Sequence, residues 1–196
     1  MGFGLTIRLL QFRWIARAMK TGRVNKCIEK LIALLDTSLS SRGFALHPVE
    51  TPFDDKHFVR WERGHGWRTD VVRLSYPRRY LEESGWVEAH LSINLATEGH
   101  IFTGIDVAEV VRKRGSYSYY LPTFFIFPLP WRYPAFARRV ARDVEQALVW
   151  FDGYGTPQRC LEQLKSGISA LGDARPSGAY ARALSFLEHE IGKATD

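Results

Sequence analysis

Cysteine is scarce in this chain of 196 residues, which contains only Cys27 and Cys160. The two lie far apart and neither belongs to a C-x-x-C pair, so a disulfide scaffold and a cysteine-rich zinc site are excluded. Such usage is typical of a reducing compartment, and we expect a cytoplasmic protein. Cys27 falls on an apolar helical stripe, which favours a small core residue over a nucleophile.

Long hydrophobic runs are also absent, because no window has 18 consecutive apolar residues. No transmembrane helix is therefore expected. With 45% hydrophobic, 13% aromatic and 24% charged residues, the composition is that of an ordinary globular domain. At this length folding buries roughly 70% of the surface of the unfolded chain, so the core needs neither a metal nor a disulfide.

Acidic residues are missing from the first 28 positions, and the first one is Glu29. That stretch carries six basic residues, which leaves 21 basic and 21 acidic residues, and no net charge, in the rest of the chain. The net charge of +6 is therefore a property of the N-terminus. A domain built for nucleic acid usually has a basic face of its own, so we do not expect nucleic acid as the partner.

The basic N-terminal segment, residues 1–22, has three interpretations. Its basic residues are Arg8, Arg13, Arg17, Lys20, with apolar Leu5, Leu9 and Phe12 able to line another helical stripe. The segment could be a terminal helix packed on the body, or an amphipathic helix on an anionic membrane surface, as the four basic side chains would favour. A targeting segment is the third interpretation, and Met1-Gly2-x-x-x-Thr6 also matches the minimal myristoylation pattern.

Residues 23–196 are predicted to form a single α+β domain. Strands follow one another without intervening helices, which indicates an antiparallel sheet. We expect four to five strands, with N- and C-terminal helices packed on one face of the sheet. Helices are predicted over 23–42, from Tyr133 to about Gly153, from Thr156-Pro157 to Gly167, and over 179–192. Strands are predicted near 44–46 and over 57–62, 67–75, 86–95 and 100–102, whereas 106–112 is either strand or helix, and 117–131 an edge strand or an ordered loop.

No familiar enzyme signature is present. His90 and His100 could approach each other across the sheet, but the six histidines show no compact metal-ligand spacing. There is no nucleophile elbow, P-loop or dinucleotide-binding glycine motif. No metal or cofactor is therefore expected, and an enzyme of unrecognised type remains only as an alternative.

Carboxylates on the predicted strands are a further candidate for catalytic chemistry. Glu62, Asp70 and Glu88 could share the polar side of the sheet and supply a pair for acid–base work. Such residues more often pair with arginines across strands, here Arg60, Arg68 or Arg73.

The polar side of the predicted strand 86–95 is the most general functional clue. Trp, Tyr and Arg contribute most of the binding energy at protein interfaces, and this region is rich in all three. The expected binding residues are Trp67, Arg73, Trp86, Glu88, His90, Asn94, Tyr117 and Tyr119. The alternative is that helices cover this face and its polar groups satisfy one another.

Several short motifs between about Asn25 and Lys165 resemble a bacterial family of uncharacterised α+β domains. They are Leu31–Leu35, Gly43-Phe44, Phe58-Val59-Arg60, Asp70-Val71-Val72 and Leu91-Ser92-Ile93-Asn94-Leu95. Some members of that family are regarded as immunity proteins that neutralise toxins by binding them, and the family supplies no catalytic residues. The resemblance implies a binding module without chemistry. A peripheral membrane protein using residues 1–20 is the alternative from a different class.

Overall fold

The computed structural model describes residues 26–47, 56–77, 86–96, 101–112, 119–120, 122–124, 127–171 and 178–193. The N-terminal segment with Arg8, Arg13, Arg17 and Lys20 lies outside the described residues, as do Tyr117 and His100. The predictions that concern them therefore stay predictions.

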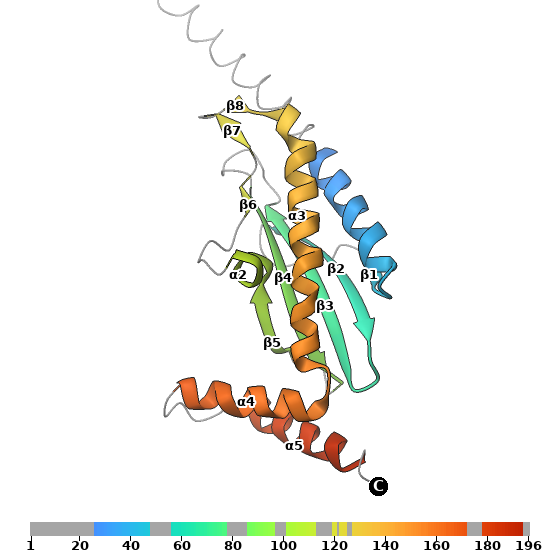
Figure 1. Cartoon of the computed structure of the whole chain (residues 1–196), viewed down its shortest axis with the longest axis vertical. Helices are drawn as coiled ribbons and strands as arrows, with labels where there is room; N and C mark the ends of the chain where they lie inside the picture. The colour runs from blue at the N-terminus through green and yellow to red at the C-terminus, as the bar shows by residue number, and fades with distance from the viewer. Residues whose placement is uncertain are drawn as a thin grey trace, which may run out of the picture.

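An antiparallel sheet forms the centre of the fold (Figure 1). Its strands follow one another in chain order: β1 (Ala45–His47), β2 (Lys56–Gly64), β3 (Arg68–Pro77), β4 (Trp86–Leu95) and β5 (Ile101–Asp106). A short strand, β6 (Tyr119–Tyr120), pairs with the start of β4. Two further short strands, β7 (Thr123–Phe124) and β8 (Phe127–Pro128), pair only with each other. The proline-rich stretch thus forms short strand pieces, in line with the expectation of an edge strand or ordered loop.

The β2–β3 hairpin forms because apolar and polar residues alternate along both strands and a glycine-containing turn joins them. Val59 and Trp61 pair with Leu74 and Val72, so four apolar side chains meet on one face of the sheet. Gly66 takes a φ of +74°, which a residue without Cβ adopts at little cost. The His65 N–H donates to the Arg68 carbonyl at 2.8 Å and closes the turn.

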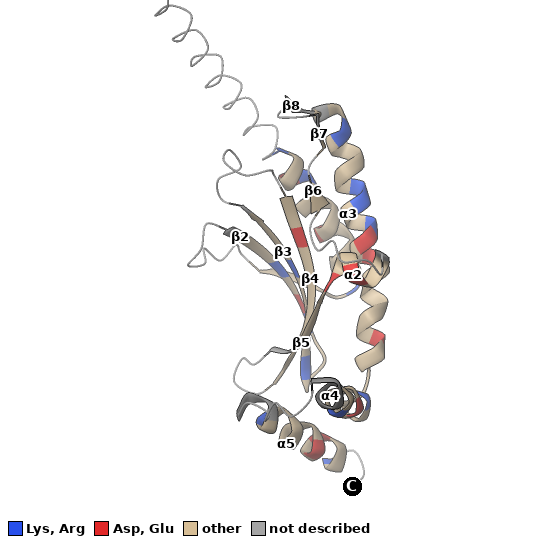
Figure 2. Ribbon diagram, turned by 90° about the vertical axis from the view of Figure 1, so that its left-hand side faces the viewer, with Lys and Arg blue, Asp and Glu red and all other residues tan. Residues whose placement is uncertain are grey.

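Helices cover one face of the sheet (Figure 2). They are an N-terminal helix over residues 26–40, α2 (Val107–Arg112) and α3 (Tyr133–Ala147), the last preceded by the 3-10 turn η1 (Pro130–Arg132). The α+β architecture with helices on one face is therefore confirmed, and residues 107–112 are helix rather than strand. Fully buried side chains of these layers, such as Leu31, Trp61, Leu91 and Val140, form one continuous core.

The C-terminal region departs from prediction at two glycines. Helix α3 ends at Ala147, before Gly153, and the chain tightens into the 3-10 helix η2 (Leu148–Tyr154), a common ending for α-helices. This turn places Phe151, which is fully buried, in the core. Helix α4 (Pro157–Leu171) begins as expected but continues through Gly167, since one interior glycine costs only about 1 kcal/mol.

Helices α4 and α5 (Gly178–Lys193) lie beyond the end of the strands (Figure 1). They share a second, smaller apolar cluster built on Leu95, Cys160, Leu161 and Leu187. The N–H of Arg159 donates to Thr156 Oγ1 at 3.2 Å, which confirms Thr156 as the N-cap of α4.

Candidate functional site

The face of the sheet turned away from α2 and α3 gathers most of the predicted binding residues. We call it the open face, because none of the described helices crosses it (Figure 2). The register places alternate residues of the strands on it. Its described members include Ala45, His47, Phe58, Arg60, Glu62, Thr69, Val71, Arg73, Ser75, Trp86, Glu88, His90, Ser92, Asn94, Gly104, Asp106 and Tyr120.

One row of polar residues runs across all five strands of this face. The pairing register aligns, in order, His47, Arg60, Arg73, His90 and Asp106. Each strand contributes one titratable side chain, so charge is concentrated along a single line. The neighbouring row contains the small residues Val71, Ser92 and Gly104, which lets the longer side chains stand above the centre of the sheet.

At the β1–β2 end of the row, the carboxylate of Glu62 offsets the positive charge of Arg60. Glu62 lies 3.2 Å from the Nε of Arg60 and 3.2 Å from Nε2 of His47. All three side chains are part-exposed, so the pairs contribute little stability, of order 1 kcal/mol or less. Their effect is to hold the end of the row in a fixed geometry.

Arg73 lies at the middle of the row and is exposed. It faces Arg60 directly on β2, and like charges opposite each other destabilise a sheet. Its guanidinium sits over the Phe58 ring at 5.3 Å. Within the part of the chain that the structure describes, no carboxylate forms an ion pair with Arg73. An exposed arginine held over an aromatic ring is well placed to receive a carboxylate from outside.

His90 and Asp106 form the other end of the row. Nδ1 of His90 lies 3.3 Å from Oδ1 of Asp106, and both side chains are about one quarter exposed. The imidazole lies against the Cα of Gly104, where a Cβ would collide with its Nε2 and Cε1 atoms. The glycine therefore makes room for the histidine, and the carboxylate orients the ring.

The other predicted binding residues divide between the open face and the core. Trp86, Glu88 and Asn94 lie half-buried on the open face, as expected, and Ser75 donates to Glu88 at 3.1 Å. Trp67 is different, because it leaves the hairpin turn to pack on the apolar cluster of α4 and α5. The prediction that Tyr119 is a binding residue at the surface is wrong, because its side chain is 1% exposed and belongs to the main core. Pairing with Val87 places it on the face that the helices cover.

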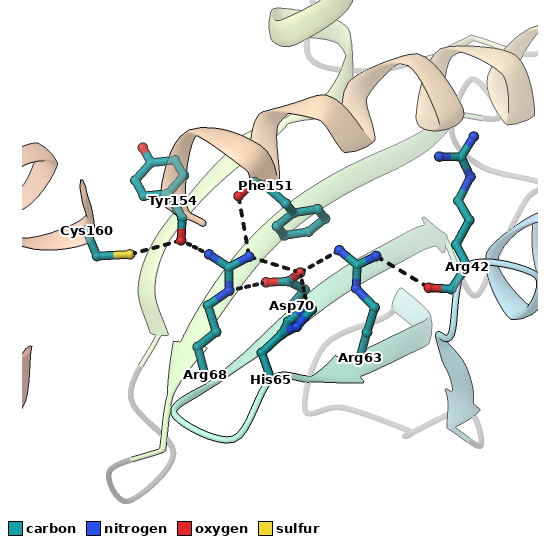
Figure 3. A network of polar contacts seen from close by, with 8 residues as sticks. All are labelled: Arg42, Arg63, His65, Arg68, Asp70, Phe151, Tyr154 and Cys160. Carbon is teal, nitrogen blue, oxygen red and sulfur yellow. Dashed lines mark hydrogen bonds and ion pairs between the residues drawn. The ribbon is translucent and has the colours of Figure 1, made fainter. Parts of the chain in front are cut away.

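Asp70 also lies on the covered face, so the predicted grouping of Glu62, Asp70 and Glu88 is wrong. Asp70 pairs with Ile93, one residue out of phase with the open face. It is fully buried and surrounded by three cationic or ionisable side chains (Figure 3). Its carboxylate lies 2.8 Å from Arg63, 3.0 Å from His65 and 2.9 Å from Arg68.

The Asp70 network joins the sheet to the chain that leads into α4 (Figure 3). Arg68 donates to the carbonyls of Phe151 and Tyr154, the last turn of η2, where a positive charge is favoured. Cys160 of α4 donates to the same Tyr154 carbonyl. The network thus holds the sheet against the segment before α4, which indicates a structural role for Asp70.

The two thiols are buried among apolar side chains. Desolvation raises the pKa of Cys27 and of Cys160 to about 11. Neither thiol is therefore a nucleophile at neutral pH. Among the described residues, no cluster of three or more His, Cys, Asp or Glu side chains has the geometry of a metal site.

None of the helices that the structure describes is both long and apolar enough to cross a bilayer. No family model matches the sequence, and no curated protein or solved structure matches the chain.

Sequence reasoning missed one property of this region, the opposition of Arg60 and Arg73 at the centre of the polar row. The alternation assigned both arginines to strands, but only the strand register reveals that they are neighbours. Counting residue pairs outward along both strands from the turn at Gly66 would have predicted that the two arginines face each other.

Proposed function

We propose that this chain is a non-enzymatic binding module whose open face takes a protein partner. The observation that carries the proposal is Arg73, an exposed arginine on a central strand, opposed by Arg60 and without a described ion pair. Arginine and tryptophan are the residues most enriched at binding hot spots, and Trp86 lies on the same face.

The chemistry of the face defines the partner. Arg60, Arg73 and His90 stand side by side in the polar row, so the complementary surface should present carboxylates to its centre. Glu88 and Asp106 lie near the margins, which favours a basic or polar rim on the partner. The sequence resemblance to presumed immunity proteins makes a toxin neutralised by this surface the first partner to test.

The test uses the substitution Arg73→Glu. It replaces a like-charge pair with Arg60 by an attractive one, so stability should be unchanged or rise by about 0.2–1 kcal/mol. Partner binding should fall on the order of 100-fold, because a central arginine is both lost and reversed in charge.

The measurement is calorimetric titration of a partner recovered by affinity purification from the cells that express the protein. Arg138→Glu, on the exposed side of α3, is the matched control and should bind as the parent does. A Kd that is insensitive to Arg73→Glu would remove the open face as the site. Absence of any stoichiometric protein partner, with the parent intact and folded, would reject the binding module itself.

A further inference from the structure

Helix α3, which covers one face of the sheet, carries several arginines along its length (Figure 2). Its exposed residues are Ala135, Arg138, Arg139, Arg142 and Gln146. Arg132, immediately before the helix, is exposed as well. We call the four arginines the α3 arginine row. Asp143 and Glu145 belong to the same helix and would balance this charge if they lay on its exposed side.

The structure buries the side chain of Asp143 and part-buries that of Glu145. Asp143 is 4% exposed and Glu145 accepts a hydrogen bond from Ser38 of the N-terminal helix. Asp143 lies 3.6 Å from Arg142, which nevertheless remains 64% exposed. The described exposed surface of α3 therefore carries positive charge only.

The α3 arginine row extends along the helix, with exposed apolar side chains beyond both of its ends. At 1.5 Å rise per residue, Arg132 and Arg142 are separated by about 15 Å along the axis. Trp131 is 72% exposed at the start of the row, and Val149 is 64% exposed beyond its end. Arg139 lies over the Tyr119 and Phe136 rings, at 6.0 and 5.6 Å, which braces it against the body.

We propose that the α3 arginine row docks on an anionic lipid bilayer. Arginines on one side of a straight helix can all reach a single plane, where their planar donor groups fit lipid phosphates. An exposed tryptophan at the end of such a row suits the headgroup region, where aromatic rings with a polar edge are enriched.

Two features favour a bilayer over nucleic acid or an acidic protein. Single-strand binders interleave several aromatic rings with the cations, whereas the described exposed residues between Arg132 and Val149 include no aromatic side chain. The sequence also predicts a second basic element, residues 1–20, suited to the same lipid chemistry. Two weak contacts on one chain reinforce each other through effective concentration.

The inference is independent of the proposed function, because the two surfaces lie on opposite sides of the sheet (Figure 2). Docking through α3 leaves the open face turned toward water and accessible to a partner. Either surface can fail its test without affecting the other.

The experiment measures partitioning of the full chain onto phosphatidylcholine vesicles with and without phosphatidylglycerol. A background variant, Arg8→Ser, Arg13→Ser, Arg17→Ser and Lys20→Ser, removes the contribution of the N-terminal segment. In that background, we expect binding only to the anionic vesicles. Adding Arg132→Gln, Arg138→Gln and Arg142→Gln should lower the partition coefficient roughly 100-fold.

Three controls make the result specific. Lysine at the same three positions should bind more tightly than glutamine but more weakly than arginine, because the charge is kept and the planar donor group is lost. Arg60→Gln with Arg73→Gln, on the open face, should leave it unchanged. The thermal midpoint of the glutamine variant should match its parent, since the substituted side chains are exposed.

Three outcomes would overturn the proposal. The background variant could fail to bind anionic vesicles, which would assign all lipid binding to residues 1–20. The glutamine variant could bind as tightly as its parent. An oligonucleotide could bind more tightly than the vesicles at equal salt, with the same dependence on the three arginines, and the row would then be a nucleic-acid site.

Discussion

Arg68 and Asp70 lie two residues apart on β3 and form a buried ion pair, with Nε and Oδ1 separated by 2.9 Å. Asp70 is fully buried and Arg68 is 5% exposed. The same guanidinium reaches the carbonyls that end η2, so the pair couples the sheet to the start of the C-terminal helices (Figure 3). A buried charge of this kind is stable only while its partners remain.

Asp70→Asn should therefore destabilise the fold strongly. The substitution leaves Arg68 and Arg63 facing a neutral amide, and removing one partner of a buried pair typically costs about 3–5 kcal/mol. Urea unfolding followed by circular dichroism measures the loss. Asp106→Asn, at a part-exposed carboxylate, is the matched control and should cost about 1 kcal/mol or less. Equal losses in the two variants would show that the Asp70 network is no more than a surface ion pair.

The buried thiols predict a loss of stability at alkaline pH. Burial raises the pKa of Cys27 and Cys160 from 9.0 to about 11, so between these values the folded state holds protons that the unfolded state has released. Stability should fall as pH rises from about 9 to 11. Replacing both cysteines by alanine should flatten this part of the profile, as measured by urea midpoints. An equally steep profile in the double variant would assign the loss to other groups.

Sequence pattern alone was sufficient for most of the sheet, but β5 spans Ile101–Asp106 where the pattern predicted a strand over 100–102. The alternation of Val87, Ala89, Leu91, Ile93 and Leu95 predicted both the strand and its buried side, and each of these residues is buried. The pattern failed where glycine was taken as a stop signal, at Gly153 and Gly167. Packing of the following turn and helix decided those boundaries, and packing depends on contacts distant in sequence.

The candidate site was predictable in part. Strand parity placed Trp86, His90 and Arg73 together, because neighbours on one face are fixed by register. Parity within β3 puts Asp70 in phase with the apolar Val72 and Leu74, and grouping it with Glu62 and Glu88 disregarded that phase. Tyr119 was misassigned because a proline-rich aromatic stretch has no period that distinguishes surface from core.

Gly104→Ala should displace His90 without unfolding the protein. The new methyl group would overlap the imidazole ring, which must turn away from Asp106. Nuclear magnetic resonance detects the displacement as altered chemical shifts of the His90 ring protons. In the Gly104→Ala background, a further Asp106→Asn substitution should no longer change these shifts. Gly64→Ala is the control, since a Cβ at that position meets nothing within 4 Å. Unchanged His90 shifts in Gly104→Ala would contradict the described packing of the ring.

The double substitution Trp86→Ala and His90→Ala tests whether the open face binds a protein partner. Both residues lie on it half-buried; His90 pairs with Arg73, and Trp86 lies on the same face of β4 beyond Glu88. Tryptophan and arginine are the residues most enriched at hot spots. The double variant should lose partner binding, by at least about 30-fold, while His90→Ala alone leaves the thermal midpoint nearly unchanged. Isothermal titration and thermal melts give the two quantities on the same samples.

The two measurements separate binding from packing. Trp86 pairs in register with exposed Tyr120 at the edge of the sheet, so part of any stability loss belongs to that contact. Tyr120→Ala therefore isolates that contact: it removes the Tyr120 ring, which shares the open face with Trp86, but keeps the Trp86 and His90 side chains. If Tyr120→Ala weakened binding as much as the double variant does, the site would lie at the β4–β6 edge. If the double variant bound the partner normally, the open face would not be the binding site, and its polar row would serve only the stability of the fold.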